Sequence, residues 1–402
     1  MKPLRVLYCT DTYPPQVNGV SVVASLSVDG LSFRGWQCGV VSPRYPTNWH
    51  DPFRRADVAY SRTYLTTLPS VPLPGYPDIR LSLPRRSQVE EAIRAVRPHI
   101  VHAQTEFVIG RMGAQAALRA GIPLVTSYHT DFGRYAAAYG VPAIEGLVSR
   151  SLARFHRAAA RTYTPGGPAA EDLRRMGVAN VEVWGRGVDL EIFSPDRRTD
   201  SVRSTLGLDG AFVFLHVGRL AAEKGVERIL AAFALARERL APRSVRLVIA
   251  GSGPRKDSLQ AAAPPDTHFL GHLDRSTALP ALYASADAFL FASHTETLGL
   301  VVLEAMASGL PVVAAPMGGV ADHLRHDVNG LAYAGGDVPA FADALVRVVQ
   351  DDLLHRRLSG GARRTALGLS WENEMDRLDA SYREVIAGSP AGGAAVPRLY
   401  SA

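Results

Sequence analysis

The amino-acid sequence predicts an α/β protein made of two consecutive doubly wound units. Short runs rich in β-branched and aromatic residues alternate with helix-like patterns along both halves of the chain. This rhythm is typical of parallel sheets that are covered by helices on both faces. The chain has 402 residues, more than a single hydrophobic core usually spans, so we expect two domains with a cleft between them.

The first half, residues 1–188, is expected to form the N-terminal domain. Its predicted strands lie at 4–9, 38–41, 100–103, 124–127 and 161–164. Its predicted helices lie at 20–33, 86–96, 109–120, 145–160 and 168–176. Residues 42–85 contain eight prolines, which break regular patterns, so we expect an irregular segment there. This segment either shapes one side of the cleft or is an ordinary surface loop.

The second half, residues 189–369, repeats the pattern. Its predicted strands lie at 212–217, 246–250, 268–270, 288–291 and 311–314. Its predicted helices lie at 225–240, 256–263, 279–284, 300–307 and 339–350. We expect a hinge near 187–200, a helix at about 370–387 that packs back onto the first domain, and a disordered tail at 388–402, where Gly, Ala and Pro are frequent.

Composition narrows the class of protein. The apolar share is 47%, and no stretch reaches the eighteen or so apolar residues that span a bilayer. Cys9 and Cys38 are the only cysteines, which excludes a disulfide framework and a thiolate metal cluster. The apolar run after Met1 is too short for a secretion signal, so we expect a cytoplasmic protein.

Charge is unevenly distributed along the chain. Residues 1–188 carry 22 basic and 13 acidic side chains, a net charge of +9, while the remainder has a net charge of −3. A basic first half suits an anionic partner such as a membrane surface. The chain contains no zinc-finger spacing, basic zipper or ribonucleoprotein signature, so we expect no nucleic-acid partner.

One predicted helix of the first half carries a stripe of arginines. At 100° per residue, four arginines share a narrow stripe opposite an apolar face: Arg150, Arg154, Arg157 and Arg161. A solvated helix face explains this pattern adequately. The alternative is a contact with anionic lipid headgroups, to which each arginine near the surface adds about 1 kcal/mol.

The most informative motif contains two glutamates, Glu296 and Glu304, separated by seven residues, with Gly299 between them. The glycine predicts a turn that opens a helix, and the first N–H groups of a helix favour phosphate. Glu296 is expected in the turn, and Glu304 about two turns into the helix, where a carboxylate can accept paired hydroxyls. The spacing alone occurs by chance in many proteins, but a phosphate seat beside hydroxyl acceptors suits a nucleotide sugar.

Basic residues and glycine turns follow other strands of the second half. Arg219 and Lys224 follow the strand at 212–217, and two fixed cations there can clamp a diphosphate. Lys224 is one of only three lysines, whereas arginine is the basic residue used almost everywhere else in the chain. Gly251 and Gly271 each end a predicted strand in a turn, a weak signal by itself.

These stretches resemble glycosyltransferase family 4, the retaining nucleotide-sugar glycosyltransferases of GT-B fold. The likeness is nearly continuous from Ser293 to Gly309 and extends over residues 4 to about 386. The resemblance implies two Rossmann-like domains that face each other across a cleft. It also implies that Arg219 and Lys224 bind the diphosphate, that Gly251 and Gly271 lie beside the nucleotide, and that the turn containing Leu298, Gly299 and Leu300 lies beside the donor.

The first half matches the same family at three places. By resemblance, Gly19 approaches the donor phosphates, Asp11 faces the acceptor, and His129 in Ser-Tyr-His-Thr is the histidine that contacts the donor sugar. Asp131 is a weaker candidate, and Arg186 either contacts a ligand or belongs to a plain turn. In the family, Glu296 and His129 hold the sugar, and Glu304 holds the ribose.

The sequence therefore predicts a hexosyltransferase that needs no cofactor besides its sugar donor. No Asp-x-Asp motif is present to hold a catalytic metal, and the family is metal-independent. GDP-mannose is the favoured donor, because residues 74–84 and 184–189 resemble GDP-mannose-dependent α-mannosyltransferases that act on lipid-linked acceptors at the cytoplasmic membrane face. Leu300 departs from that subgroup, which usually has asparagine there.

Two alternatives remain open at this stage. The Thr-Leu-Gly-Leu sequence and Tyr128-His-Thr also resemble UDP-glucose-dependent diacylglycerol α-glucosyltransferases, so a UDP-hexose is the second donor. UDP-sugar 2-epimerases share the fold and are the further alternative. A binding protein with an inactive site is disfavoured by the intact set of Arg219, Lys224, Glu296 and Glu304.

Overall fold

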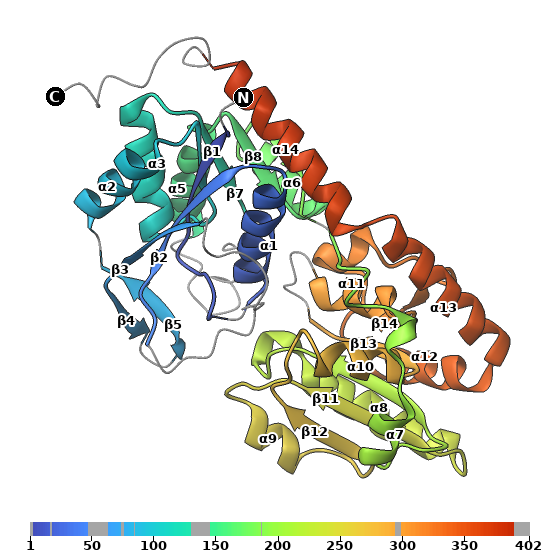
Figure 1. Cartoon of the computed structure of the whole chain (residues 1–402). Coiled ribbons are helices and arrows are strands. Elements are labelled where there is room, and N and C mark those ends of the chain that lie inside the picture. The colour runs from blue at the N-terminus through green and yellow to red at the C-terminus, as the bar shows by residue number, and fades with distance from the viewer. Residues whose placement is uncertain are drawn as a thin grey trace. The chain divides into compact units, whose positions relative to one another are not determined.

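The chain folds as two α/β units, each built on a parallel sheet (Figure 1). The computed structural model describes residues 3–16, 18–46, 63–73, 76–83, 85–129, 145–185, 187–293 and 299–389. Unit 1 comprises Met1–Gly185 and Glu372–Ala402, and unit 2 comprises Arg186–Trp371. The predicted class, two Rossmann-like domains, is confirmed.

Unit 1 contains a seven-stranded sheet with the order β3-β2-β1-β6-β7-β8-β9, in which every pair is parallel. The strands are β1 Arg5–Cys9, β2 Gln37–Pro43, β3 Tyr64–Leu68, β6 Ile100–Ala103, β7 Leu124–Ser127, β8 Arg161–Thr164 and β9 Val181–Val183. The helices are α1 Gly19–Phe33, α2 Arg86–Val96, α3 Val108–Ala120, α5 Glu145–Arg157, α6 Gly167–Arg175 and α14 Trp371–Ala387. Strands β4 Ser70–Leu73 and β5 Tyr76–Ser82 form a separate antiparallel hairpin.

Unit 2 contains a six-stranded parallel sheet with the order β12-β11-β10-β13-β14-β15. The strands are β10 Phe212–Val217, β11 Val245–Ala250, β12 Thr267–Gly271, β13 Ala288–Phe291, β14 Val312–Ala314 and β15 Gly330–Ala332. The α-helices are α7 Asp200–Thr205, α8 Val226–Leu240, α9 Lys256–Ala261, α10 Ala278–Ser285, α11 Leu300–Ala307, α12 Val338–Gln350 and α13 Asp352–Leu367. Short 3₁₀ turns are η3 Pro195–Arg197, η4 Ala222–Lys224 and η5 Gly318–Asp322.

Helices cover both faces of the sheet in unit 2, which explains the continuous apolar runs of its strands. Successive residues of β10 point to opposite faces: Phe214 joins the core under α8 and α12, while Val213 and Leu215 join the core under α10 and α11. All three side chains are fully buried. A strand buried on both faces needs apolar residues at nearly every position, and β10 has them except at His216, whose Nδ1 lies 3.0 Å from the carbonyl oxygen of Leu290.

The sequence analysis missed three edge strands, the hairpin β4–β5 and the helices α7 and α13. Strands β3 and β9 are the two edges of the sheet in unit 1, β15 is one edge of the sheet in unit 2, and β9 and β15 have three residues each. The proline-rich stretch at 42–85, expected to be irregular, contains β3 and the hairpin β4–β5 in its described part. Short edge strands lack the long apolar runs that identify buried strands, so periodicity does not detect them.

Helix α14 packs on unit 1 through buried polar contacts as well as apolar ones, and Figure 1 shows it as the last helix of the chain. The Tyr382 hydroxyl lies 3.0 Å from the Tyr8 hydroxyl of β1 and also bonds Nδ1 of His102 in β6. The Trp184 indole N–H donates to the carbonyl of Glu374, at 2.7 Å. These bonds fix α14 against β1 and β6 in the middle of the sheet and against the end of the edge strand β9.

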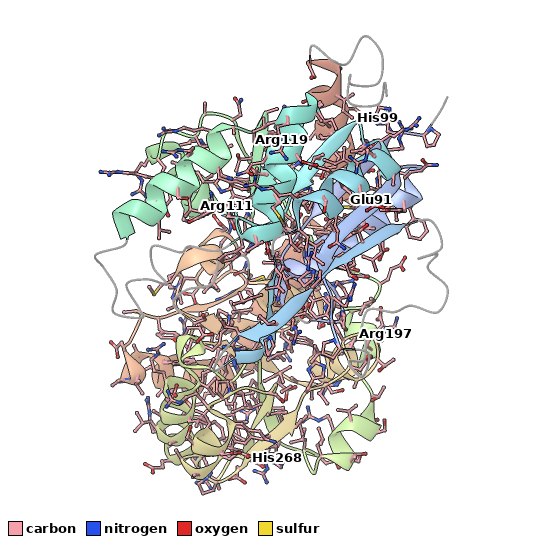
Figure 2. The ribbon with its side chains drawn as sticks, turned by 90° about the vertical axis from the view of Figure 1, so that its left-hand side faces the viewer. Glu91, His99, Arg111, Arg119, Arg197 and His268 are labelled. Atoms are coloured by element: carbon pink, nitrogen blue, oxygen red, sulfur yellow. The ribbon has the colours of Figure 1, made fainter. Side chains whose placement is uncertain are left out.

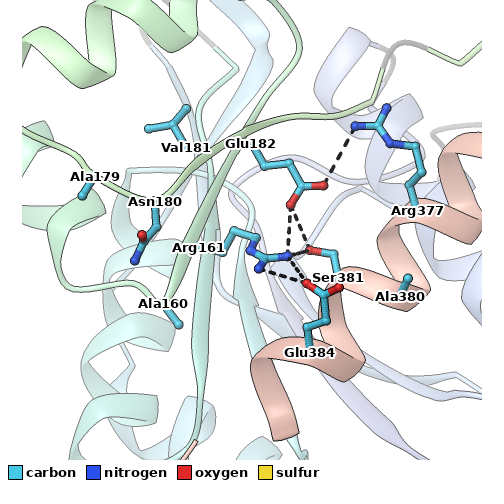
Figure 3. Close-up of a pocket in the computed structure, with 10 residues that line it drawn as sticks. All are labelled: Ala160, Arg161, Ala179, Asn180, Val181, Glu182, Arg377, Ala380, Ser381 and Glu384. Atoms are coloured by element: carbon cyan, nitrogen blue, oxygen red, sulfur yellow. Dashed lines mark hydrogen bonds and ion pairs between the residues drawn. The ribbon is translucent and has the colours of Figure 1, made fainter. Parts of the chain in front are cut away.

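The arginine helix is shorter than predicted. Helix α5 ends at Arg157, and Arg161 is the first residue of β8. Figure 3 shows the Arg161 guanidinium bound to Glu182 of β9 and to Ser381 and Glu384 of α14, with a distance of 3.1 Å to Oε2 of Glu182. Extending the helix to Arg161 was therefore wrong, because the residue is needed as the first residue of a paired strand.

The first prediction concerns the buried hydroxyl of Tyr382. Changing Tyr382→Phe leaves the polar atoms of Tyr8 and His102 without this partner in a fully buried place, so we expect a loss of about 1–3 kcal/mol in the free energy of unfolding of unit 1. Urea denaturation followed by tryptophan fluorescence measures it. Tyr64→Phe, at a position that is 41% exposed, is the matched control and should change little. Equal stability of both variants would contradict the anchoring role of Tyr382.

Candidate functional site

The described site residues of unit 2 gather where its strand order reverses. From β10 the chain proceeds to β11 and β12 on one side, and it returns to β13, β14 and β15 on the other. Ligands of open α/β sheets bind outside the carboxyl ends of the strands at this switch point. The carboxyl end of β10 leads to Gly218, Arg219 and Lys224, and that of β13 leads to residues 293–300.

Glycines bring the turns after β10, β11 and β12 into contact. At Gly251, which has φ +143°, an added Cβ would lie 1.9 Å from the carbonyl oxygen of Gly218. The N–H of Gly251 donates to the carbonyl of Gly271, at 2.7 Å. Gly271 has φ +72° with no atom within 4 Å of a Cβ position. At these three glycines the backbone is not covered by a side chain of its own, which lets a ligand approach it closely.

Arg219 and Lys224 flank the first of these turns. Arg219 is exposed, and its guanidinium lies 4.0 Å from the carboxylate of Glu223. Lys224 ends η4 and is half-buried, and Gly225 follows it in a left-handed conformation with φ +61°. An ion pair of this length at an exposed guanidinium is screened by solvent and contributes little to stability.

Helix α11 begins at Leu300, directly after its N-cap residue Gly299 with φ 70°, and glycine has no side chain with which to cap the helix. This is the glycine turn that the sequence predicted at the start of a helix. Glu304 is the fifth residue of α11, so it lies about one turn from the start and not two as expected. The predicted helix start at Leu300 is confirmed, and the four steps from Leu300 to Glu304 make only about one turn.

Glu304 is 3% exposed, and two side chains that the sequence analysis missed hold it. Its Oε1 accepts two bonds from Arg275, at 3.1 Å from Nε and 2.7 Å from Nη2, and its Oε2 accepts one from Tyr283, at 3.2 Å. The Arg275 guanidinium also lies over the Phe193 ring, 5.0 Å from its centroid. Since a carboxylate has about four acceptor positions, one on Oε2 remains for a ligand hydroxyl.

Several predicted site residues lie outside the described residues. These are Glu296, Leu298, Asp131 and Arg186. Gly299 and Leu300 lie within the described part, at the cap and the first position of α11.

In unit 1 the strand order reverses between β1 and β6, and Asp11 follows β1 there. Its carboxylate caps the start of α3: Oδ1 accepts the N–H of Ile109 at 2.9 Å, and Oδ2 accepts the N–H of Gly110 and the hydroxyl of Thr105. Burial raises the pKa of the Asp11 carboxyl above its ordinary value, and these hydrogen bonds partly oppose the rise. The sequence analysis gave Asp11 an acceptor role and missed this structural one.

Helix α3, which Asp11 caps, carries arginines that tie it to its neighbours (Figure 2). Arg111 donates from Nε to the carbonyl of Glu106 at 2.6 Å and lies over the ring of Phe155 in α5. Arg119 pairs with Glu90 of α2 at 2.9 Å. Arg111 therefore holds the first turns of α3 against α5, and Arg119 holds its last turn against α2.

Gly19 is the first residue of α1, immediately after its cap. The Asn18 side chain accepts the N–H of Ser21, and the Ser21 hydroxyl accepts the N–H of Asn18, a reciprocal capping box. An added Cβ at Gly19 would meet no atom within 4 Å, and the residue does not have a positive φ. The fold itself therefore does not require glycine at this position.

His129 follows β7, the next strand after β6, and is joined to a residue that the sequence analysis did not select. Its Nε2 lies 2.8 Å from Nε2 of Gln104, which follows β6. Surrounding protein lowers the pKa of His129 to about 4, chiefly by desolvation and further by His156, so the ring is neutral at pH 7. A single chain position gives no sign of such a pairing between two strand ends.

The four predicted arginines have different surroundings. Arg150 and Arg154 are exposed on α5. Arg157 donates to the carbonyls of Gly177, at 3.1 Å, and Met176, just beyond the C-terminus of α6, where a cation is favourable. With Arg161 bound to Glu182, only Arg150 and Arg154 match the predicted surface stripe.

No helix among the described residues combines the length and the apolar character that crossing a membrane requires. Across the described ranges, no group of three or more His, Cys, Asp or Glu side chains is arranged to hold a metal ion.

The fold and these two switch points are those of a GT-B glycosyltransferase. The chain belongs to glycosyltransferase family 4: residues 17–192 match the Glycosyltransferase Family 4 profile, and residues 211–351 match that of Glycosyl transferases group 1. It is an enzyme of the transferase class.

Two similar relatives are named GDP-mannose-dependent alpha-mannosyltransferase. The one from Mycobacterium tuberculosis is 32% identical, with 95% of this chain and 97% of the relative covered. The one from Mycolicibacterium smegmatis is 34% identical, with 95% and 98% covered. The alpha-monoglucosyldiacylglycerol synthase of Streptococcus pneumoniae is 31% identical, with 77% and 71% covered.

Among solved structures, sucrose-phosphate synthase from Thermosynechococcus elongatus has the same fold. The TM-score is 0.78 at 20% identity, with 96% of this chain and all of that chain covered. HepE from Anabaena in complex with UDP-glucose gives a TM-score of 0.73 at 19% identity, with 95% and 99% covered. Likeness at these identities concerns the fold alone.

A second prediction separates the structural role of Asp11 from catalysis. In Asp11→Asn the amide accepts fewer N–H groups at the start of α3, so we expect the free energy of unfolding to fall by about 1–2 kcal/mol. Thermal or urea unfolding measures it. Asp376→Asn, at an exposed ion pair with Arg34, is the control and should cost less than about 1 kcal/mol. An unchanged stability of Asp11→Asn would refute the capping role.

Proposed function

We propose that this protein transfers a hexose, with GDP-mannose as the favoured donor, onto a lipid-linked or glycolipid acceptor. The observation that carries the proposal is the set of groups at the switch point of unit 2: two cations, three glycine turns, an uncapped helix start and a buried carboxylate. The two mycobacterial relatives that align over almost their whole length support the mannosyl donor.

The leaving diphosphate is the group that these residues suit best. Arg219 offers a guanidinium fork, Lys224 a point charge, and the start of α11 offers backbone N–H groups. Together they stabilise negative charge as the sugar bond breaks, which is the task a metal ion performs elsewhere. We therefore propose metal-independent transfer with no cofactor beyond the nucleotide sugar.

The remaining contacts divide the donor into parts. Glu304 accepts a ribose hydroxyl on Oε2, the position that Arg275 and Tyr283 leave available. Gly251 and Gly271 present backbone to the nucleotide. His129 and Glu296 hold the sugar, and the family resemblance supports retention of configuration by front-face attack.

A UDP-hexose is the second candidate donor. Leu300 opens α11 where the mannosyltransferase subgroup usually has a polar residue, and the Streptococcus pneumoniae relative is named a glucosyldiacylglycerol synthase. The apolar side chain of Leu300 offers no hydrogen bond by which one particular sugar could be recognised, so it weakens the argument for GDP-mannose. Both donors therefore enter the experiment below.

The acceptor side is proposed to lie at the cytoplasmic membrane face, with the protein bound peripherally. Arg150 and Arg154 are exposed on α5 and suit anionic lipid headgroups. Arg157 and Arg161 have partners within unit 1, so the contact we propose rests mainly on the first two. Arg150→Gln with Arg154→Gln should weaken binding to anionic vesicles.

The third prediction tests the reaction. Purified protein is given GDP-mannose, UDP-glucose or UDP-galactose with anionic vesicles that contain diacylglycerol or a glycolipid, and nucleotide release is measured. We expect GDP release from GDP-mannose, and a large rise in the donor KM for Glu304→Gln, which loses the charged acceptor. Glu90→Gln, in an exposed ion pair of unit 1, is the control. Release of UDP instead would select the second donor, and an absence of nucleotide binding would overturn the proposal.

The fourth prediction uses Gly19, where the fold leaves room for a side chain. Gly19→Ala should leave the free energy of unfolding unchanged or slightly raised, because alanine favours the helix and meets no atom. If donor phosphates approach this backbone, the methyl group should raise the donor KM about tenfold or more. A variant with normal stability and normal KM would remove Gly19 from the proposed donor site.

A further inference from the structure

Gln104 lies buried at the carboxyl end of β6, beside the histidine proposed to hold the sugar. Its backbone N–H donates to the carbonyl of Cys9 in β1, at 2.9 Å, and its side chain has no exposed surface. Its amide Nε2 lies 2.8 Å from Nε2 of His129. The contact joins the ends of two adjacent strands, so it ties the imidazole to the rigid part of the sheet.

The contact determines where the imidazole carries its proton. An amide nitrogen only donates, so the ring nitrogen that faces it must be the acceptor. A neutral imidazole has one bare nitrogen and one N–H, and Nε2 is then the bare one. The proton is left on Nδ1, and the pKa of about 4 for His129 keeps the ring in this neutral form at pH 7.

A polar amide at this depth needs an explanation. Oε1 of Gln104 is buried and has no hydrogen-bond partner in the described part of the chain. Burying such an atom without a partner is unfavourable, and an apolar side chain of similar size would avoid that cost. One hydrogen bond to His129 does not offset that cost, so the stability of the fold alone does not explain a glutamine at this position.

Other titratable groups surround the pair. His102 of β6 and His156 of α5 both couple electrostatically to His129, and His102 is itself held neutral by burial. Oε1 of Glu106 lies 3.6 Å from Nε2 of His156, and burial raises the pKa of the Glu106 carboxyl. Gln104 is uncharged and contacts His129 directly, so its effect on the ring is separable from theirs.

We infer that Gln104 is a positioning residue: it holds His129 in the tautomer with the proton on Nδ1, the group that then donates to a hydroxyl of the donor sugar. The inference rests on the proposed function, which gives His129 its contact with the sugar. Gln104 itself touches no substrate and acts only through the ring. Its removal therefore affects the sugar and leaves the nucleotide contacts of unit 2 unchanged.

The experiment compares Gln104→Leu, Gln104→Glu and His129→Ala with Ser127→Ala in the full chain. Ser127 bonds Nε2 of His102 in the same buried cluster, so it controls for general loosening. For each variant, kcat, donor KM, the dissociation constant of GDP or UDP alone, and the pH profile are measured. Nitrogen NMR of histidine-labelled protein, with His129→Ala to assign the signal, reports the tautomer.

Gln104→Leu should lower kcat about tenfold to a hundredfold with nucleotide affinity unchanged, and Ser127→Ala should retain activity. Glutamate at 104 accepts rather than donates, so it should move the proton to Nε2 and raise the pKa of His129 through its charge. The activity of Gln104→Glu should then fall at acidic pH where the wild type does not, because an imidazolium opposes positive charge developing on the sugar.

The outcomes separate two kinds of failure. If His129→Ala impairs turnover and Gln104→Leu does not, Gln104 has no positioning role while the proposed function stands. If His129→Ala has no effect on turnover, the sugar role of His129 fails and takes the inference with it. A wild-type spectrum with the proton on Nε2 overturns the assigned tautomer directly.

Discussion

Both units depend on one constraint of topology. Each has a central parallel strand, and the chain adds strands first on one side of it and then on the other. In unit 2 that strand is β10, and in unit 1 it is β1. Loops that leave such a strand and its neighbour diverge, so the space above their carboxyl ends is not covered by a crossover helix. Arg219 with Gly299, and Asp11 with Gln104, stand at these positions because of topology and not because of proximity in sequence.

Polar groups buried in the sheets serve two purposes that burial alone does not distinguish. Asp11 and Tyr382 satisfy backbone and side-chain partners of the fold, and each has several bonds that explain its presence. Gln104 has one partner and an unbonded oxygen. Gln104 therefore differs from Asp11 and Tyr382, whose several bonds account for their burial.

The sequence predicted the central elements well because each has a strong local signal. Continuous apolar runs identified β10 and β13, and Gly299 before an apolar run identified the start of α11. What it missed depends on tertiary pairing: the edge strand β9, the Arg275 fork on Glu304, and the Gln104 contact with His129. The end of α5 failed for the same reason, since Arg161 obeys helical periodicity yet pairs in β8.

The Glu304 carboxylate is held in a fixed orientation by its neighbours. A carboxylate that is only 3% exposed would be costly to bury alone, and the Arg275 fork on Oε1 offsets that cost. The fork also fixes the plane of the carboxylate, with Tyr283 holding Oε2 from a second direction. Because both partners come from the segment after β12, the contacts that hold the carboxylate come from the same segment as the Gly271 turn. For the ribose contact proposed above, the hydroxyl would meet an acceptor that needs no reorientation, and such preorganisation favours binding.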